Sequence, residues 1–357
     1  MELLPNGISG LANRIEELGM KFGLWIEPEM VNKDSDLYRK HPDWILQTPG
    51  RRVSHGRYQY VLDFSRKEIV DYIYGMIAKL LSESNISYIK WDMNRSITEC
   101  YSIAYPADQQ GEIFHRYILG VYDLYERLTS AFPEVLFESC ASGGGRFDPG
   151  MLYYAPQGWV SDDSDAVERL KIQYGTSMCY PLSSMGSHVS VIPNHQVFRN
   201  TPLHTRANVA YFGTFGYELD LNKLSDAEIE EVKAQIRFMK EYRELLQFGT
   251  FYRLKSPFNG NETVWMVVSE DKSKALVGYY RVLNGVNLPY SCVKLQGLDP
   301  DKLYENELAN TEHYGDELMN LGLITTDVSA GEVPQGAEPC TDFESRIYLL
   351  KEKQSTN

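Results

Sequence analysis

Apolar residues recur along the first two thirds of the chain with two different spacings, which predict alternating helices and strands. Apolar positions three or four residues apart predict helices, and short β-branched runs between them predict strands. The predicted helices cover residues 7–19, 65–82 and 111–130, a segment after Asp165, and residues up to about Phe248. The predicted strands cover residues 21–30, 86–92, 134–140, 158–165, 185–194 and 207–216. Each strand ends in polar or glycine-rich sequence.

Three of the predicted helices follow a capping-box signature, in which Ser, Thr or Asp precedes Glu by three residues. The pairs are Ser65–Glu68, Asp165–Glu168 and Ser225–Glu228. Each pair predicts that a helix begins immediately after its first residue.

Two stretches depart from this alternation. Residues 32–58 are polar and aromatic without periodicity, and long loops of this kind in compact enzymes are usually functional or disordered. From about Thr250, short alternating runs at 262–269, 275–281 and 346–351 are separated by turn residues, which predicts a small antiparallel β-domain with a stabilising role. We therefore expect a catalytic barrel domain over residues 1–248 and a β-domain over residues 249–357.

The polar strand ends favour a parallel (β/α)8 barrel, the TIM-barrel type of α/β fold, because the chemistry of such barrels lies at the carboxyl ends of their strands. A doubly wound sheet would instead place a glycine-rich phosphate turn after its first strand, and the sequence has none there. The six predicted strands are two fewer than a closed barrel needs. The expected barrel is therefore incomplete, with six of eight β/α units, and lacks its first two strands.

Composition narrows the classes of function. The chain has 357 residues, 43% of them hydrophobic, which is enough to bury a large core. Its net charge of −14, with no basic block, disfavours nucleic acid and anionic membranes as partners. The five cysteines are odd in number and form no CxxC pair, which predicts a reducing, cytoplasmic location and argues against a zinc site. We expect no metal and no cofactor.

The stretch from Ile86 to Arg95 carries the clearest candidate chemistry. Side chains alternate across a strand, so Lys90, Asp92 and Asn94 share one face. A lysine beside an aspartate favours the ionised acid and keeps a nucleophile ready. The alternative interpretation is a structural ion pair at the sheet edge.

Two later strand ends add to this chemistry. Cys140 is followed by a loop with glycines at 143–145, which let the backbone approach a ligand closely. Three aspartates at 162, 163 and 165 repel one another, and this repulsion raises the pKa of at least one carboxyl unless it is solvated, as a general acid requires. The capping box already explains Asp165.

Four motifs, in this order, carry a resemblance to a known family. The segments 23–29, 90–95, 140–146 and 159–169 resemble those of the retaining α-galactosidases of glycoside hydrolase family 36 (clan D), and the similarity runs along the whole chain. The resemblance implies that Asp92 is the nucleophile and Asp162 the general acid/base. It also implies galactose contacts from Trp25, Arg57, Lys90, Cys140 and Gly143, and Asn94 is a further candidate.

These roles agree with the residue types. A retaining glycosidase needs two carboxyl groups about 5 to 5.5 Å apart, one as nucleophile and one as acid and base. We expect Lys90 to keep Asp92 ionised, and Asp163 and Asp165 to help keep Asp162 protonated. The choice of Asp162 over Asp163 rests on the resemblance.

The resemblance implies hydrolysis of terminal α-D-galactosyl residues in oligosaccharides of the raffinose and melibiose type, by a homo-oligomer in the full-length form. A transglycosylase, an α-N-acetylgalactosaminidase and an inactive truncated remnant that binds carbohydrate weakly remain alternatives. Family members carry an N-terminal β-sandwich domain and two further barrel strands, which we do not find in the sequence. We therefore expect a gene fragment or a misplaced start, with Met1 internal to a longer protein.

Overall fold

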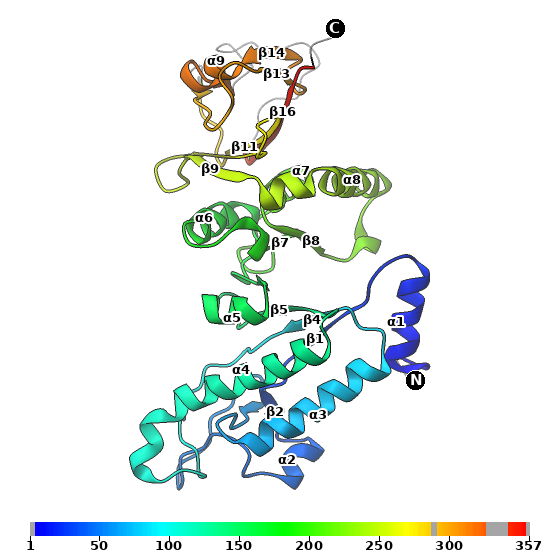
Figure 1. Ribbon diagram of the computed structural model, residues 1–357, viewed down its shortest axis with the longest axis vertical. Helices are drawn as coiled ribbons and strands as arrows, with labels where there is room; N and C mark the ends of the chain where they lie inside the picture. Colours follow the sequence, from blue (N-terminus) through cyan, green and yellow to red (C-terminus); the bar gives the residue numbers. More distant parts are fainter. Residues whose placement is uncertain (1–3, 287–290, 326–341, 355–357) are drawn as a thin grey trace. The chain divides into compact units, whose positions relative to one another are not determined.

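The computed structural model describes residues 4–286, 291–325 and 342–354 (Figure 1). Internal contacts group the chain into two compact units, residues 1–162 and 163–357. Every helix within the described ranges is too short or too polar to cross a membrane.

The first unit contains a four-stranded parallel sheet. Its strands, in the order β1-β4-β5-β6, are Gly23–Ile26, Tyr88–Trp91, Leu136–Ser139 and Gln157–Gly158. The register places Lys90 of β4 beside Trp25 of β1 and Glu138 of β5. Because the strands are parallel, their carboxyl ends meet at one edge of the sheet, as the barrel prediction requires.

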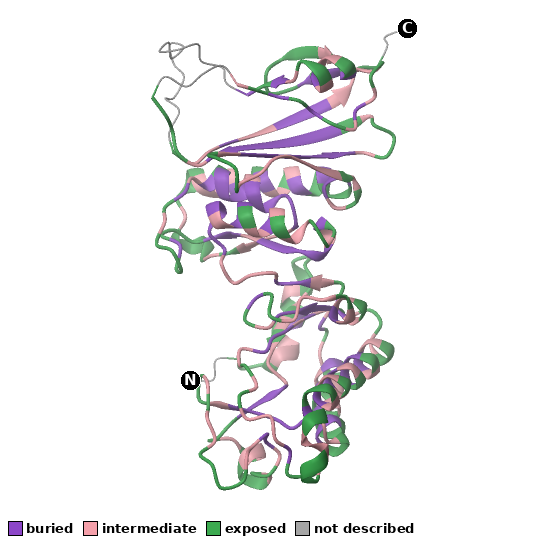
Figure 2. Ribbon diagram, turned by 90° about the vertical axis from the view of Figure 1, so that its left-hand side faces the viewer, coloured by how far each residue is buried: buried purple, intermediate pink, exposed green. Residues whose placement is uncertain are grey.

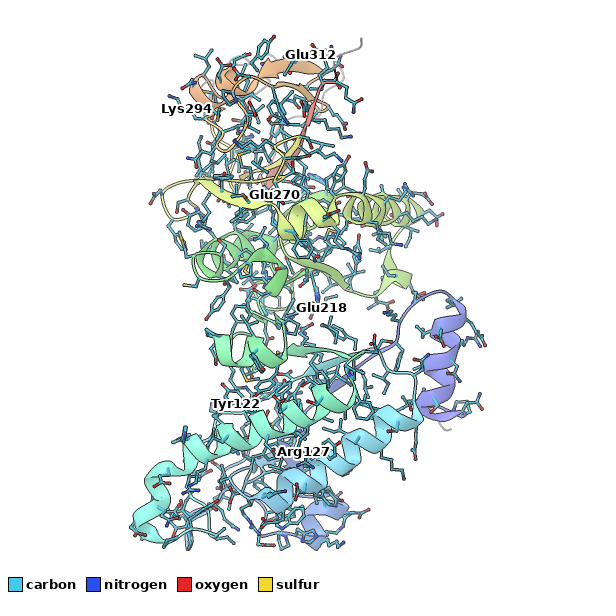
Figure 3. The ribbon with its side chains drawn as sticks, viewed as in Figure 1. Tyr122, Arg127, Glu218, Glu270, Lys294 and Glu312 are labelled. Carbon is cyan, nitrogen blue, oxygen red and sulfur yellow. The ribbon has the colours of Figure 1, made fainter. Side chains whose placement is uncertain are left out.

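Helices cover this sheet and complete the core of the first unit. They are α1 (Gly7–Glu17), α3 (Lys67–Glu83), α4 (Ile113–Ala131) and α5 (Pro149–Tyr154), with a 3₁₀ turn at 107–112 before α4. The helices α3 and α4 lie side by side (Figure 1). Arg127 on α4 is labelled in Figure 3; it pairs with Asp71 on α3 at 2.8 Å and lies 4.0 Å over the ring of Tyr74. Apolar positions of both helices are buried, among them Ile73 and Val121.

The aperiodic stretch after β1 forms a small subdomain of the first unit. The strand β2 (Met30–Asn32) pairs antiparallel with β3 (Gln59–Val61), and α2 (Asp36–Lys40) lies between them in sequence. This connection follows the carboxyl end of β1, so it belongs to the same edge as the other strand ends.

The second unit begins with helices around two parallel strands. It contains α6 (Ala166–Thr176), β7 (Gly186–Ser190), α7 (Leu203–Ala210), β8 (Thr214–Glu218) and α8 (Asp226–Phe248). Strands β7 and β8 pair in parallel. The described residues therefore hold four strands that pair in parallel in the first unit and two in the second, which together equal the number predicted.

The remainder of the second unit is an antiparallel sheet, in the order β14-β13-β16-β11-β10-β9. These strands are Thr311–Tyr314, Leu303–Asn306, Glu344–Glu352, Lys274–Arg281, Glu262–Val268 and Thr250–Lys255. A short pair, β12 (Cys292–Val293) with β15 (Leu323–Ile324), and α9 (Gly315–Asn320) complete it. The central strands are almost entirely buried (Figure 2). All three predicted strand runs of this region are confirmed.

Two of the three predicted helix-capping residues are confirmed. Asp165 caps α6, and Ser225 caps α8 with the complete capping box. The capping box at Ser65 is wrong, because the N-cap of α3 is Arg66 and the Ser65 hydroxyl donates to Asp63 instead.

The strand predicted over residues 207–216 is also partly wrong. Its first four residues end helix α7, and the strand begins only at Thr214. A short, mostly apolar run gives too little periodicity to distinguish a helix from a strand, which explains the error.

Candidate active site

Asp92 lies directly after β4, and its side chain accepts hydrogen bonds from several sides. Trp25 Nε1 and Asn94 Nδ2 donate to Oδ2 at 3.1 and 2.6 Å, and the backbone nitrogen of Met93 donates to Oδ1 at 2.8 Å. Only 6% of the residue is exposed. Burial by itself would raise the pKa of Asp92, but hydrogen bonds from Cys140, Asn94, Trp25 and Met93 together lower that pKa below its usual range. The structure therefore keeps this carboxylate ionised.

Among the described residues Lys90 forms its ion pair with Glu138 and not with Asp92, so the expected direct pairing of Lys90 with Asp92 is wrong. Its Nζ lies 3.1 Å from Glu138 Oε1 and 4.5 Å from the centre of the Trp159 ring. Glu138 also accepts hydrogen bonds from Tyr88 and from Gln157 Nε2. Residues two apart on one strand are farther from each other than cross-strand neighbours, so Lys90 reaches its partner on β5 rather than Asp92. The lysine remains on the same face as Asp92.

Glu27 joins two of the predicted sugar-binding residues, although the sequence did not single it out for the site. Asn94 Nδ2 and Arg57 Nη1 donate to its Oε1 at 2.6 and 3.2 Å, and Gln59 Nε2 donates to Oε2 at 3.1 Å. Its side chain is only 6% exposed, whereas that of Arg57 is 57% exposed. The clue in the sequence was a carboxylate just past the end of the apolar strand at 23–26.

The glycine-rich loop after β5 connects Asp92 with Asp162. The backbone nitrogen of Ser142 donates to Asp92 Oδ1 at 3.4 Å. Gly143 has a φ of +80°, and a Cβ on it would lie 2.7 Å from the backbone nitrogen of Asp162 and 2.9 Å from Ser161 Cα. Only glycine fits so close to another backbone in this conformation. The loop therefore contacts both predicted catalytic segments: Ser142 donates to Asp92, and Gly143 packs against the backbone of Ser161 and Asp162.

The aspartate cluster separates into different roles. Asp162 is partly exposed. Asp165 is buried, accepts hydrogen bonds from the backbone nitrogens of Val167 and Glu168, and is ion-paired with Arg199. Burial raises the pKa of Asp165 above its usual value, and the charge of Asp163 adds to this rise, while the backbone hydrogen bonds and Arg199 oppose it.

Glu29 is the centre of a buried cluster of polar contacts that includes the residue before Asp92. Glu29 is fully buried and accepts hydrogen bonds from Trp91 Nε1 at 2.7 Å and from the Tyr117 hydroxyl at 2.5 Å. Arg146 Nη1 donates to its Oε2, and Nη2 lies beside its Oε1, both at 2.9 Å. Burial would lower the pKa of Arg146, but the charge of Glu29 raises that pKa well above its usual range. Trp91 precedes Asp92, and Arg146 closes the glycine-rich loop, so this ion pair ties together the two segments that meet at Asp92.

Comparison with known proteins identifies the family. Residues 1–249 match the Melibiase family model, and residues 262–350 match the glycosyl hydrolase family 36 C-terminal domain. The chain is 57% identical over 351 residues to alpha-galactosidase AgaA of Geobacillus stearothermophilus and 51% identical over 347 residues to alpha-galactosidase Mel36A of Lactobacillus acidophilus. These alignments cover 98% and 97% of this chain and 46% of each relative.

Solved structures agree with this result. Alpha-galactosidase AgaB of Geobacillus stearothermophilus superimposes with a TM-score of 0.93 at 54% identity, over 98% of this chain and 47% of that one. A variant of AgaA in complex with raffinose superimposes with a TM-score of 0.92 at 53% identity, with the same coverage. The chain spans about half the length of the curated relatives it matches. It therefore belongs to the melibiase family and has the family 36 glycosyl hydrolase C-terminal domain, with the barrel-type α/β fold and antiparallel β-domain that the sequence predicted.

Proposed function

We propose that this chain carries the catalytic chemistry of an α-galactosidase, which hydrolyses terminal, non-reducing α-D-galactosyl residues by a retaining double displacement. The observation that carries the proposal is the environment of Asp92. Its carboxylate lies at the end of a parallel strand, is kept ionised by hydrogen bonds, and is linked through the glycine-rich loop to Asp162. The relatives named above are all α-galactosidases, and this supports the same activity.

In the first step, an oxygen of Asp92 attacks the anomeric carbon of galactose, and the bond from that carbon to the leaving oxygen breaks. Asp162 gives its proton to the leaving oxygen at the same time. In the second step, Asp162 takes a proton from water, the water oxygen bonds to the anomeric carbon, and the bond to Asp92 breaks. Galactose leaves with its original anomeric configuration, and both carboxyl groups return to their starting states.

The proposed contacts with galactose come from Trp25, Arg57, Lys90, Asn94, Cys140 and Gly143. Trp25 leaves 46% of its surface exposed although its ring nitrogen is bound to Asp92, so its ring can stack on the sugar. Burial, then the charge of Asp92, raises the pKa of Cys140 far above its usual range. This thiol therefore stays neutral and lines the site rather than acting as a nucleophile.

Several properties of the whole protein belong to the proposal. The substrates are oligosaccharides of the raffinose and melibiose type, since a relative has been solved with raffinose. The barrel domain covers residues 1–248 and the β-domain residues 249–357, and the end of α8 at Phe248 supports this boundary. We also propose that the protein is a homo-oligomer. We propose a cytoplasmic location because free thiols are typical of a reducing compartment, and the four cysteines in the described ranges, Cys100, Cys140, Cys179 and Cys292, are free. Cys340 lies outside those ranges.

Two measurements test the proposal. The first is hydrolysis of an aryl α-galactoside by the purified chain, with Asp92→Asn as control; turnover that persists in the variant would remove Asp92 from the mechanism. The second is NMR observation of the galactose first released from melibiose. The α-anomer is expected for retention, and the β-anomer would exclude double displacement.

A further inference from the structure

Glu138 is a buried carboxylate on β5 that no step of the proposed mechanism uses. Only 2% of the residue is exposed. It lies two residues before Cys140 and, in the register of the sheet, directly beside Lys90 on β4 and Gln157 on β6. Burying a charged carboxylate is unfavourable unless charged or polar neighbours compensate for the lost water, so its partners indicate its role.

The two oxygens of Glu138 have different partners. The Tyr88 hydroxyl and Gln157 Nε2 both donate to Oε2, the amide at a distance of 3.0 Å. Gln157 Nε2 also donates to the Tyr88 hydroxyl at 3.2 Å, which links these two groups to each other. The other oxygen, Oε1, lies 3.1 Å from Lys90 Nζ. Groups on the neighbouring strands therefore fix one oxygen of the carboxylate, and the other oxygen faces the lysine.

An aromatic ring holds Lys90 on a second side. Its Nζ lies 4.5 Å from the centre of the Trp159 ring, and Trp159 itself is buried. The long, flexible side chain of a lysine loses much of its rotamer freedom when contacts hold it on two sides. The Lys90 side chain is still 24% exposed. Because an ammonium has three donors, one directed at Glu138 leaves others for an acceptor such as a sugar hydroxyl.

We propose that Glu138 is a positioning residue, which holds the Lys90 ammonium where it donates to one hydroxyl of galactose. This inference rests on the proposed function and deepens it, because it names the group that orients one of the proposed sugar contacts. A lysine that is ordered in advance loses less entropy when the sugar binds, so the benefit falls on the affinity for galactose. An ion pair that only stabilised the sheet would favour no particular hydroxyl.

Calorimetric titrations of the chain in an Asp92→Asn background, which prevents turnover, test this proposal. The ligands are methyl α-galactoside and its monodeoxy analogues, each of which lacks one hydroxyl. Lys90→Met identifies the hydroxyl that the ammonium binds, because removal of that hydroxyl should no longer weaken binding once the lysine is absent.

Glu138→Gln keeps the size of the side chain but removes its charge. We expect it to raise the dissociation constant of methyl α-galactoside about tenfold, equivalent to about 1.4 kcal/mol. The analogue without the identified hydroxyl should bind Glu138→Gln and the parent equally well, because it makes no contact with Lys90. The other analogues should lose affinity as methyl α-galactoside does.

Three further variants complete the test. Glu83→Gln removes the charge from another glutamate–lysine pair, which is exposed on α3, and should change the binding of no ligand. Glu138→Gln added to Lys90→Met should weaken methyl α-galactoside no further, because Glu138 acts through the lysine. Tyr88→Phe removes a donor to Glu138 but keeps the ion pair; it should weaken methyl α-galactoside about threefold, with the same dependence on the hydroxyl. It replaces Glu138→Gln if that variant does not fold.

The outcomes separate this proposal from the proposed function. Equal weakening of every ligand would mean that Glu138 only maintains the fold, and unchanged binding would mean that the lysine needs no positioning; either result overturns the proposal. So does a full further loss in the double variant. If Lys90→Met changes the binding of no ligand, the proposal is overturned while the galactose site stands. If methyl α-galactoside does not bind the parent at all, the galactose site is refuted, and the proposal falls with it.

Discussion

The buried ion pair between Glu29 and Arg146 leads to a prediction about stability. Glu29 is fully buried, only 15% of the Arg146 side chain is exposed, and both nitrogen–oxygen distances are 2.9 Å. Glu29→Gln keeps the size of the side chain but removes its charge, which leaves the Arg146 guanidinium buried without a counter-ion. Removing one partner of a buried pair typically costs about 3 to 5 kcal/mol, and we expect about 3 kcal/mol here because the amide oxygen can still accept a hydrogen bond.

Urea denaturation followed by tryptophan fluorescence measures this loss, since Trp91 donates to Glu29 at 2.7 Å. A matched control is Glu83→Gln on α3. Its partner Lys79 is 3.9 Å away and both side chains are mostly exposed, so this change should cost less than about 0.5 kcal/mol.

A double mutant tests the physical reason. Once Glu29→Gln is present, adding Arg146→Met should cost far less than Arg146→Met alone, because the second change then removes an unpaired buried charge. If Glu29→Gln destabilises the chain no more than the exposed control, or if the effects of the two changes simply add, the ion pair does not stabilise the fold in this way.

Three further predictions concern catalysis. Trp25→Phe removes a hydrogen-bond donor to Asp92 and so raises the pKa of that carboxyl, which the hydrogen bonds around it hold below its usual range. Because activity needs the ionised carboxylate, the acid limb of the kcat/KM profile should move to higher pH, and an unmoved limb would contradict this. Gly143→Ala should lower kcat about 10²-fold through displacement of Asp162, whereas Gly75→Ala, an exposed helix position with open space, should leave kcat unchanged. Asp162→Asn should spare aryl substrates with good leaving groups more than raffinose, and equal losses on both would argue against its role as acid.

The sequence predicted much of the fold because its strands are short apolar runs with polar ends. The run at 86–92 and the glycines at 143–145 placed Asp92 and the loop that contacts it at the ends of adjacent strands. Order along the chain was enough for this, since parallel strands joined by helices bring all their carboxyl ends to one edge.

The partners of each polar group could not be predicted in the same way. Lys90 pairs with Glu138 because β4 and β5 align these two residues, and no pattern in the sequence fixes that register. Glu27 and Glu29 are two residues apart, yet one contacts polar groups around the site and the other a buried arginine. Ser65 has the spacing of a capping residue, but its hydroxyl donates a hydrogen bond to the nearby carboxylate of Asp63 instead of capping the helix. Local spacing does not reveal such long-range or competing contacts.

Covalent trapping can show directly whether Asp92 is the nucleophile. A fluorinated α-galactosyl fluoride, which forms the glycosyl-enzyme but releases it slowly, is incubated with the 357-residue chain, and the digest is analysed by mass spectrometry. We expect one galactosyl adduct on the peptide that contains Asp92, and we expect it to be absent in Asp92→Asn. An adduct on Asp162 or another carboxylate, or no adduct on the folded chain, would contradict it.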